Sequence, residues 1–94
     1  MATEFVDVII SGRVQGVGYR EFARRTATAH GVAGFVRNRS DGTVEARLVG
    51  RPAALDAALA ELRRGPMHAR VRDLWIVARG EAAPQSGFFV TATL

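Results

Sequence analysis

The chain has 94 residues, the size of one small domain, so we expect a single domain over residues 1–94 and no separate cofactor-binding domain. It contains no cysteine, which excludes disulfides, thiolate zinc sites and cysteine nucleophiles and fits a cytoplasmic protein. The net charge is +4, but all thirteen basic residues are arginine, which indicates a bias of the whole chain more than a surface for nucleic acid.

The N-terminal part of the chain predicts a strand followed by a glycine-rich turn. Residues 5–10 are rich in β-branched side chains, and we expect this strand to stop at the Ser11-Gly12 turn. Residues 11–20 (SGRVQGVGYR) contain three glycines, which can adopt positive φ and bring backbone N–H groups close to an anion. These glycines are Gly12, Gly16 and Gly18. The turn therefore has the composition of a phosphate-binding loop.

A helix is predicted over residues 20–30, directly after this turn. Its N-terminus adds unpaired N–H groups and the positive end of the helix dipole, and Arg20 lies beside them, so the segment suits a phosphate group. His30 falls on the apolar side of the helix and is expected to pack at its end. Gly31 is well placed to end the helix in a left-handed conformation. The next strand is predicted over residues 32–39.

The rest of the chain predicts a hairpin, a second helix and two further strands. Residues 40–42 (SDG) are a tight-turn sequence between two strand-like segments, which should pair as an antiparallel hairpin. The second helix carries an apolar stripe of leucine and alanine at helical spacing. The elements predicted after the turn are the strand 43–49, the helix 52–64 and the strands 71–79 and 87–93.

The order of these elements is strand-helix-strand-strand-helix-strand, with a short terminal strand. It is the order of the ferredoxin-like α+β fold, a βαββαβ sandwich. Right-handed crossovers put both helices on one face of a mainly antiparallel sheet. The first strand-to-helix loop then lies at one end of the sheet, where we expect the end of the second strand to be its neighbour.

Two segments, residues 10–20 (ISGRVQGVGYR) and residues 34–38 (GFVRN), resemble the signature segments of the acylphosphatase family. The likeness continues through Gly42, Val44 and Gly50 and covers nearly the whole chain. It implies an enzyme that hydrolyses the carboxyl–phosphate bond of small acyl phosphates without a metal or another cofactor. It also implies that Arg20 and Asn38 are catalytic. The substrate phosphate-binding residues that it implies are Gln15, Gly16, Val17, Gly18, Tyr19 and Arg20.

These residue types suit the chemistry of that substrate. An acyl phosphate already has a good leaving group, a carboxylate, so the remaining barrier is largely electrostatic and positional. Arg20 can hold two phosphate oxygens bidentately while backbone donors bind others, and Asn38 can orient the attacking water. No side chain is an evident general base, so the substrate phosphate is the hypothetical proton acceptor. Tyr19 stands where the family most often has phenylalanine, and the sequence shows no use for its hydroxyl.

Other conspicuous residues fit structural roles better than chemical ones. His68 is expected to be solvated in a loop, and two histidines are too few for a histidine-rich metal site. Trp75 lies in a strand-like run and is expected in the core. The arginines at positions 63, 64, 70 and 72 could form a basic patch, but an ordinary solvated face is the favoured interpretation.

Partners other than a small molecule are not expected. RNA-binding modules of this topology place aromatic residues on the central strands within a basic-aromatic signature, and Phe5 and Phe35 lack that signature here. The N-terminus has no signal-peptide pattern, and the longest apolar run, residues 74–78, is far too short to span a membrane. We therefore expect a cytoplasmic monomer.

Two other functions remain open. A non-catalytic phosphate-binding or regulatory module would keep the loop without turnover, although Asn38 beside Arg20 argues against it, because binding alone needs no water-orienting amide. A carbamoyl-phosphate-handling domain of a larger maturation protein would come with a linker and further domains, which we do not expect here.

Overall fold

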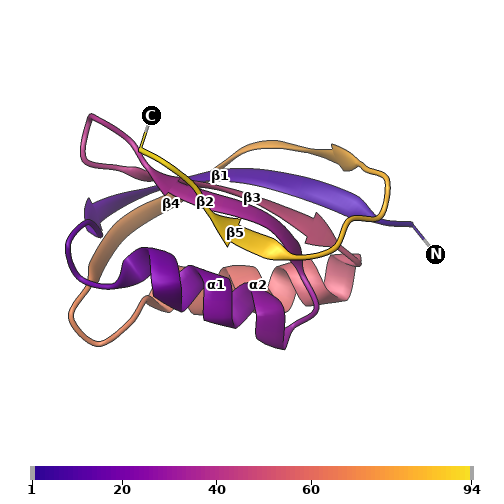
Figure 1. The fold of residues 1–94 in the computed structure, drawn as a ribbon, viewed down its shortest axis with the longest axis horizontal. Coiled ribbons are helices and arrows are strands. Elements are labelled where there is room, and N and C mark those ends of the chain that lie inside the picture. Colours follow the sequence, from indigo (N-terminus) through magenta and orange to yellow (C-terminus); the bar gives the residue numbers. More distant parts are fainter. Residues whose placement is uncertain (1, 94) are drawn as a thin grey trace.

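Residues 2–93, the part of the chain that the computed structural model describes, form two helices and five strands (Figure 1). The strands are β1 (Glu4–Arg13), β2 (Ala33–Asn38), β3 (Val44–Gly50), β4 (Arg70–Glu81) and β5 (Phe88–Val90). The helices are α1 (Tyr19–Ala29) and α2 (Pro52–Arg64). This βαββαβ order with a short terminal strand confirms the order predicted from the sequence.

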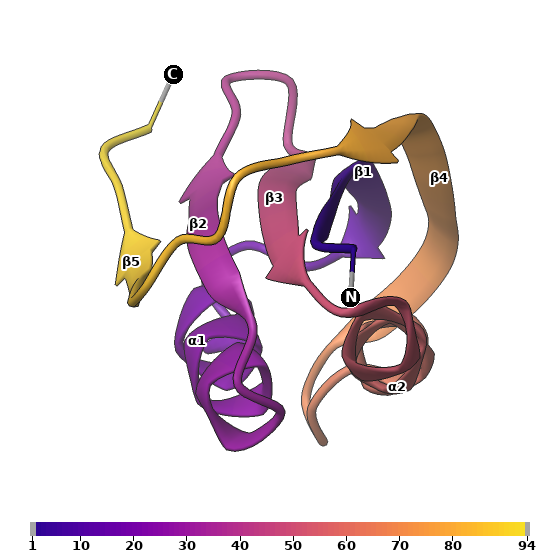
Figure 2. The same ribbon diagram turned by 90° about the vertical axis from the view of Figure 1, so that its right-hand side faces the viewer.

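The five strands form one sheet in the order β4-β1-β3-β2-β5. β1 pairs antiparallel with β3 and β4, β2 pairs antiparallel with β3, and only β5 is added in parallel, at the edge beside β2. Figure 2 shows both helices on the same face of the sheet, where α1 contacts β2 and β5 and α2 contacts β3 and β4. The predicted ferredoxin-like fold with a mainly antiparallel sheet is confirmed.

The core lies between the two helices and the face of the sheet that they cover. In β1 the alternate residues Val6, Val8 and Ile10 are fully buried, as a strand with one covered face requires. α2 contributes the apolar stripe predicted for it, Leu55, Ala58, Leu59 and Leu62. Packing of these residues holds β1 in place, and the candidate phosphate-binding loop begins where β1 ends.

The end of the first strand differs from the prediction, which placed it at Ser11-Gly12. β1 continues to Arg13 because Gly12 and Arg13 still pair with β4, opposite Val71 and Arg70. A side chain at Gly12 could not fit, since its Cβ would lie 2.1 Å from the Arg70 carbonyl oxygen. This glycine therefore permits a close approach of two strands and does not make a turn.

The prediction that Trp75 lies in the core is wrong, because 50% of its surface is exposed. Trp75 pairs with Ile9 on the face of the sheet opposite the helices. Its neighbour Leu74 pairs with the buried Ile10 and is only 8% exposed. β4 is also an edge strand, so the large ring has little to pack against.

The ends of α1 and of the β2–β3 hairpin follow the predicted turn chemistry. Gly31 and Gly42 both adopt positive φ, 69° and 91°. His30 forms the C-cap of α1, and its Nε2 hydrogen-bonds the Glu61 carboxylate of α2, so this histidine packs at the helix end as predicted. α2 begins and ends at the predicted residues, Pro52 and Arg64. The other boundaries shift by one to three residues; the largest of these shifts is at β5, which ends at Val90.

Candidate active site

The loop between β1 and α1 presents backbone N–H groups that are free to bind a ligand. Gly16 and Gly18 have φ of 72° and 80°, the left-handed region predicted for them. Within residues 2–93, no N–H group of residues 14–18 donates a hydrogen bond to another backbone carbonyl. Successive free donors in a loop of this conformation form a concave site for an anion.

The N-terminus of α1 adds further donors at the same place. Gly18 is the N-cap residue of α1 and has no side chain with which to cap the helix. The N–H groups of the first turn, which starts at Tyr19, therefore lack a capping partner and carry the positive end of the helix dipole. An anion bound here would contact the loop and the helix end together.

Arg20 lies in this first turn and has an unengaged side chain. It is half-buried and takes part in none of the ion pairs or side-chain hydrogen bonds of residues 2–93. The adjacent carboxylate, Glu21, is held instead by Arg24 through two hydrogen bonds of 2.8 and 2.6 Å, and this pairing lowers the pKa of Glu21. The Arg20 guanidinium therefore remains available for bidentate contact with a phosphate.

The loop between β1 and α1 and the N-terminal turn of α1 together form a hollow of about 350 Å³. The residues that line it are Val14, Gly16, Gly18, Tyr19, Arg20, Glu21 and Val90. Four of them belong to the phosphate-binding set predicted from the sequence. The other three, Val14, Glu21 and Val90, were not predicted. Val14 and Glu21 directly flank the predicted segment, whereas Val90 comes from β5, which reaches the site by lying alongside β2.

The Gln15 side chain anchors the loop to the β2–β3 hairpin. Its Nε2 donates hydrogen bonds of 2.8 Å to two backbone carbonyls, those of Arg39 and Thr43. Both partners are acceptors, so the amide orientation is determined and both of its protons are used. Gln15 can thus offer a phosphate its backbone N–H, while its side chain holds the loop against the end of β2.

This anchor brings the loop to Asn38, the last residue of β2 and the neighbour of Arg39. Asn38 shares the alternating pattern of the buried Val36, so its side chain lies on the face of the sheet that carries α1. Its Oδ1 is inaccessible to solvent and has no hydrogen-bond partner within residues 2–93. A buried carbonyl oxygen without a donor is unusual and points to a ligand or a bound water.

The Tyr19 side chain points away from the loop into the core. The residue is 1% exposed, and its hydroxyl donates a hydrogen bond of 2.8 Å to the carbonyl oxygen of Leu62, in the last turn of α2. Burial also raises the pKa of the Tyr19 hydroxyl above its usual range. At the site, Tyr19 can therefore act only through its backbone.

Within residues 2–93, no group of three or more His, Asp or Glu side chains is arranged to hold a metal ion. No helix of this part of the chain is long and apolar enough to cross a membrane.

A row of free N–H donors, a helix N-terminus and an arginine without an ion-pair partner in residues 2–93 lie at one end of a ferredoxin-like sheet, near the half-buried Asn38. Together they define a small phosphoryl-binding domain. The family model named Acylphosphatase matches residues 6–90. An acylphosphatase of Azorhizobium caulinodans is 46% identical over 93 residues, which cover 98% of this chain and 99% of that relative. An acylphosphatase of Rhodospirillum rubrum is 54% identical over 82 residues, covering 86% and 88% of the two chains.

A solved structure agrees with these sequence relatives. The crystal structure of acylphosphatase from Bacillus subtilis matches with a TM-score of 0.86 and 30% identity, covering 95% of this chain and 98% of that one. The chain belongs to the acylphosphatase family, and the fold and reaction class predicted from its sequence are confirmed.

Proposed function

We propose that this enzyme hydrolyses the carboxyl–phosphate bond of acyl phosphates without a metal ion, with Arg20 and the loop of residues 15–19 holding the phosphoryl group and Asn38 orienting the attacking water. The observation that carries the proposal is that three groups without protein partners lie at the same end of the sheet, where Gln15 of the loop hydrogen-bonds the carbonyl of Arg39, next to Asn38. They are the free N–H donors of the loop, the unpaired guanidinium of Arg20 and the buried Oδ1 of Asn38.

Binding of the phosphoryl group follows from charge and geometry. The planar guanidinium of Arg20 can donate two parallel hydrogen bonds to phosphate oxygens, and the loop N–H groups can bind the remaining ones. These donors stand in place before substrate binds, because glycine conformations and the Gln15 anchor hold the loop. Fixed donors stabilise the charge that spreads over the phosphoryl oxygens during in-line displacement.

Asn38 is suited to position the nucleophile. Its side-chain amide carries one acceptor and two donors, so it can hold a water molecule with a lone pair of the water oxygen directed at the phosphorus. The carboxylate leaves without needing a proton, and a phosphoryl oxygen of the substrate takes the proton of the water. Because the substrate takes the proton itself, the residue beside the water does not need to be a base, and an asparagine is sufficient. A module that only binds phosphate would not need an amide to orient water, so the non-catalytic alternative is disfavoured.

We also propose that the enzyme works as a cytoplasmic monomer on small substrates. The absence of cysteine fits a reducing compartment, and the hollow at the loop is large enough for a phosphoryl group and a small acyl group. Light scattering coupled to size-exclusion chromatography should give a mass close to 10.1 kDa. A mass of twice this value would contradict the monomer.

The decisive experiment compares two variants with a synthetic substrate, benzoyl phosphate, in the presence of EDTA. Arg20→Lys keeps the charge but loses the planar fork, so phosphate inhibition should weaken and kcat should fall with it. Asn38→Ala leaves the phosphate cradle intact, so inhibition by inorganic phosphate should persist while kcat falls at least about 10²-fold, as is typical for the loss of one positioned polar group.

The control is Arg25→Lys, an exposed residue of the same helix, which should retain wild-type kinetics. Circular dichroism should show folded protein in all three variants. Near wild-type turnover in Asn38→Ala would place water positioning elsewhere. Loss of wild-type activity in EDTA would contradict the metal-free mechanism.

A further inference from the structure

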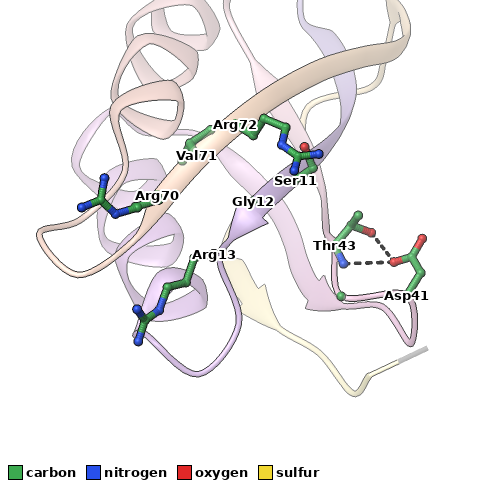
Figure 3. Close-up of a pocket in the computed structure, with 9 residues that line it drawn as sticks. Ser11, Gly12, Arg13, Asp41, Thr43, Arg70, Val71 and Arg72 are labelled. Carbon is green, nitrogen blue, oxygen red and sulfur yellow. Dashed lines mark hydrogen bonds between the residues drawn. The ribbon is translucent and has the colours of Figure 1, made fainter.

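Two hollows lie at the end of the sheet where β1 ends. The larger, of about 530 Å³, lies between the end of β1, the start of β4 and the β2–β3 hairpin (Figure 3). Figure 3 shows the side chains of Arg13 and Arg70 extending away from Arg72, so these cations do not converge on one ligand. The smaller is the hollow of about 350 Å³ at the phosphate loop. The function proposed above uses only part of its lining.

The remaining part of this lining is available to the acyl group of a substrate. The volume of the hollow lies within the range of about 300–1,000 Å³ that is usual for pockets that bind small organic ligands. The phosphoryl group is held by the loop N–H groups and Arg20, but Val90 and Glu21 line the hollow as well. An apolar side chain and a carboxylate are not donors for a phosphate. They can therefore act only on the part of the substrate that carries the phosphate.

Val90 provides the exposed apolar surface of this hollow. Two other apolar side chains line it, those of Val14 and Tyr19, and each of these residues is only 1% exposed. Val90 is 42% exposed. An acyl group in the hollow therefore contacts Val90, and covering this side chain with an apolar group favours binding through the hydrophobic effect.

Pairing with β2 holds Val90 in a fixed position. Val90 lies opposite Val36 in the parallel ladder, and the N–H of Thr91 donates a hydrogen bond of 2.9 Å to the Val36 carbonyl. Asn38 follows Val36 on the same face of β2, because side chains alternate along a strand. Val90 is thus one strand away from the row that ends in Asn38. A residue on a paired strand beside the reacting group is rigid enough to select among substrates.

The charges around the hollow disfavour a second anionic group. Among the residues of 2–93 that line it, Arg20 is the one cation and Glu21 the one anion. The phosphoryl group occupies the cation. Hydrogen bonds from Arg24 lower the pKa of Glu21, so its carboxylate is ionised at neutral pH, and Arg24 itself does not line the hollow. A negative charge on the acyl group would meet a carboxylate and an apolar side chain.

We propose that Val90 is a specificity-determining residue, which makes the enzyme prefer acyl phosphates with an apolar, uncharged acyl group over those whose acyl group carries a second anion. The inference rests on the function proposed above, because it takes the phosphoryl group to lie in the loop. Val90 acts by direct contact with the acyl group, and Glu21 adds repulsion against the disfavoured substrates. Inhibition by inorganic phosphate, which has no acyl group, reports on the loop alone.

The test compares acetyl phosphate, benzoyl phosphate and benzoyl phosphate with a carboxylate in the para position. Val90→Thr keeps the shape of the side chain but replaces a methyl group by a hydroxyl. Relative to acetyl phosphate, kcat/KM for benzoyl phosphate should therefore fall at least about threefold, the factor expected for one buried methyl group. Inhibition by inorganic phosphate should stay at its wild-type value. Threonine suits a strand, so circular dichroism should show a folded protein.

A second variant, Val90→Lys, tests the charge preference by placing a cation beside the acyl group. In the wild type, the para carboxylate should lower kcat/KM relative to benzoyl phosphate. The lysine should raise the ratio of these two values about two- to fivefold, the effect of one exposed charge pair.

The matched controls are Val77→Thr and Val77→Lys. Val77 is a 60% exposed valine of β4 that does not line the hollow. Both controls should keep the wild-type ratios between substrates. Wild-type ratios in both Val90 variants would overturn the proposal. Equal changes in the Val77 variants would also overturn it, because net charge or strand stability would then account for them.

Failure of the proposed function would look different from failure of this inference. If the proposed function is wrong, the wild-type protein hydrolyses none of the three substrates or is not inhibited by inorganic phosphate, and both proposals fall. If only the role of Val90 is wrong, turnover and phosphate inhibition remain, and the substrate ratios of the Val90 variants match the wild type.

Discussion

Tyr19 shows how one residue of a functional segment can have a structural task. The sequence places it within the phosphate-binding segment, next to Arg20. In the structure its ring is buried, and its hydroxyl satisfies a carbonyl in the last turn of α2. The last four carbonyls of a helix lack partners within the helix, so this hydrogen bond joins the start of α1 to the end of α2.

We therefore predict that Tyr19→Phe lowers stability without affecting catalysis. Removing the hydroxyl leaves the Leu62 carbonyl buried without its donor, which should lower the free energy of unfolding by about 1–3 kcal/mol in urea denaturation. kcat and KM for benzoyl phosphate should stay at wild-type values. A tenfold loss of kcat with unchanged stability would mean instead that the hydroxyl takes part in the reaction.

At the scale of elements, the shape of the phosphate loop, residues 14–18 between β1 and α1, is determined by its backbone conformation and not by close packing at its glycines. Gly16 and Gly18 adopt positive φ, yet a Cβ at either position would have no atom within 4 Å. A side chain there is opposed only by the left-handed backbone, which β-branched residues strongly disfavour. A substitution at Gly16 or Gly18 would therefore strain the backbone of the loop without a steric clash between the new Cβ and a neighbouring atom.

Gly16→Val and Gly18→Val should each lower the free energy of unfolding by about 1–3 kcal/mol, the usual cost of a strained backbone conformation. Both should also reduce kcat/KM, because the strained loop moves its N–H donors away from the phosphate. Thermal melts and steady-state kinetics measure the two effects. The control is Gly50→Ala, where the new Cβ lies in ordinary contact, 3.5 Å from Val32 Cγ2. Wild-type melting and activity in both valine variants would show that neither position needs glycine.

At the scale of the whole molecule, the sheet has one face covered by helices and one face without them. β4 lies at an edge, so adjacent residues on it have opposite surroundings: Leu74 faces the helices, and Trp75 lies on the other face. Large apolar side chains also remain exposed around Trp75, namely Ile76 and Val77. Burial on this strand is therefore decided by its place in the sheet and not by hydrophobicity.

Leu74→Ala should lower the free energy of unfolding by about 2–5 kcal/mol, as is typical for a large-to-small change in a core. Trp75→Thr should cost less than about 1 kcal/mol, because half the ring is solvated and threonine suits a strand. Urea denaturation followed by circular dichroism gives the free energy of unfolding of both variants. In the wild type, acrylamide should quench the fluorescence of this single tryptophan in the folded state. A larger loss from Trp75→Thr than from Leu74→Ala would contradict the assignment of the two faces.

The sequence by itself determined the element order, the ferredoxin-like fold, the family and the reaction class, because periodicity, turn chemistry and two signature segments are local properties of the chain. It also indicated which glycines of the loop adopt positive φ, since no other residue does so without cost. The roles of Arg20 and Asn38 rest on the resemblance together with their unpaired side chains, and the kinetic experiment above tests them.

Only the tertiary structure decided which atoms meet across the fold. The Gln15 side chain reaches the β2–β3 hairpin, 24 and 28 residues along the chain, and the Tyr19 hydroxyl reaches Leu62, 43 residues away. The pairing of Arg13 with Arg70 and the exposure of Trp75 likewise depend on strand register and on the order of strands in the sheet. Register and strand order arise from packing of the whole chain, so no local pattern encodes them.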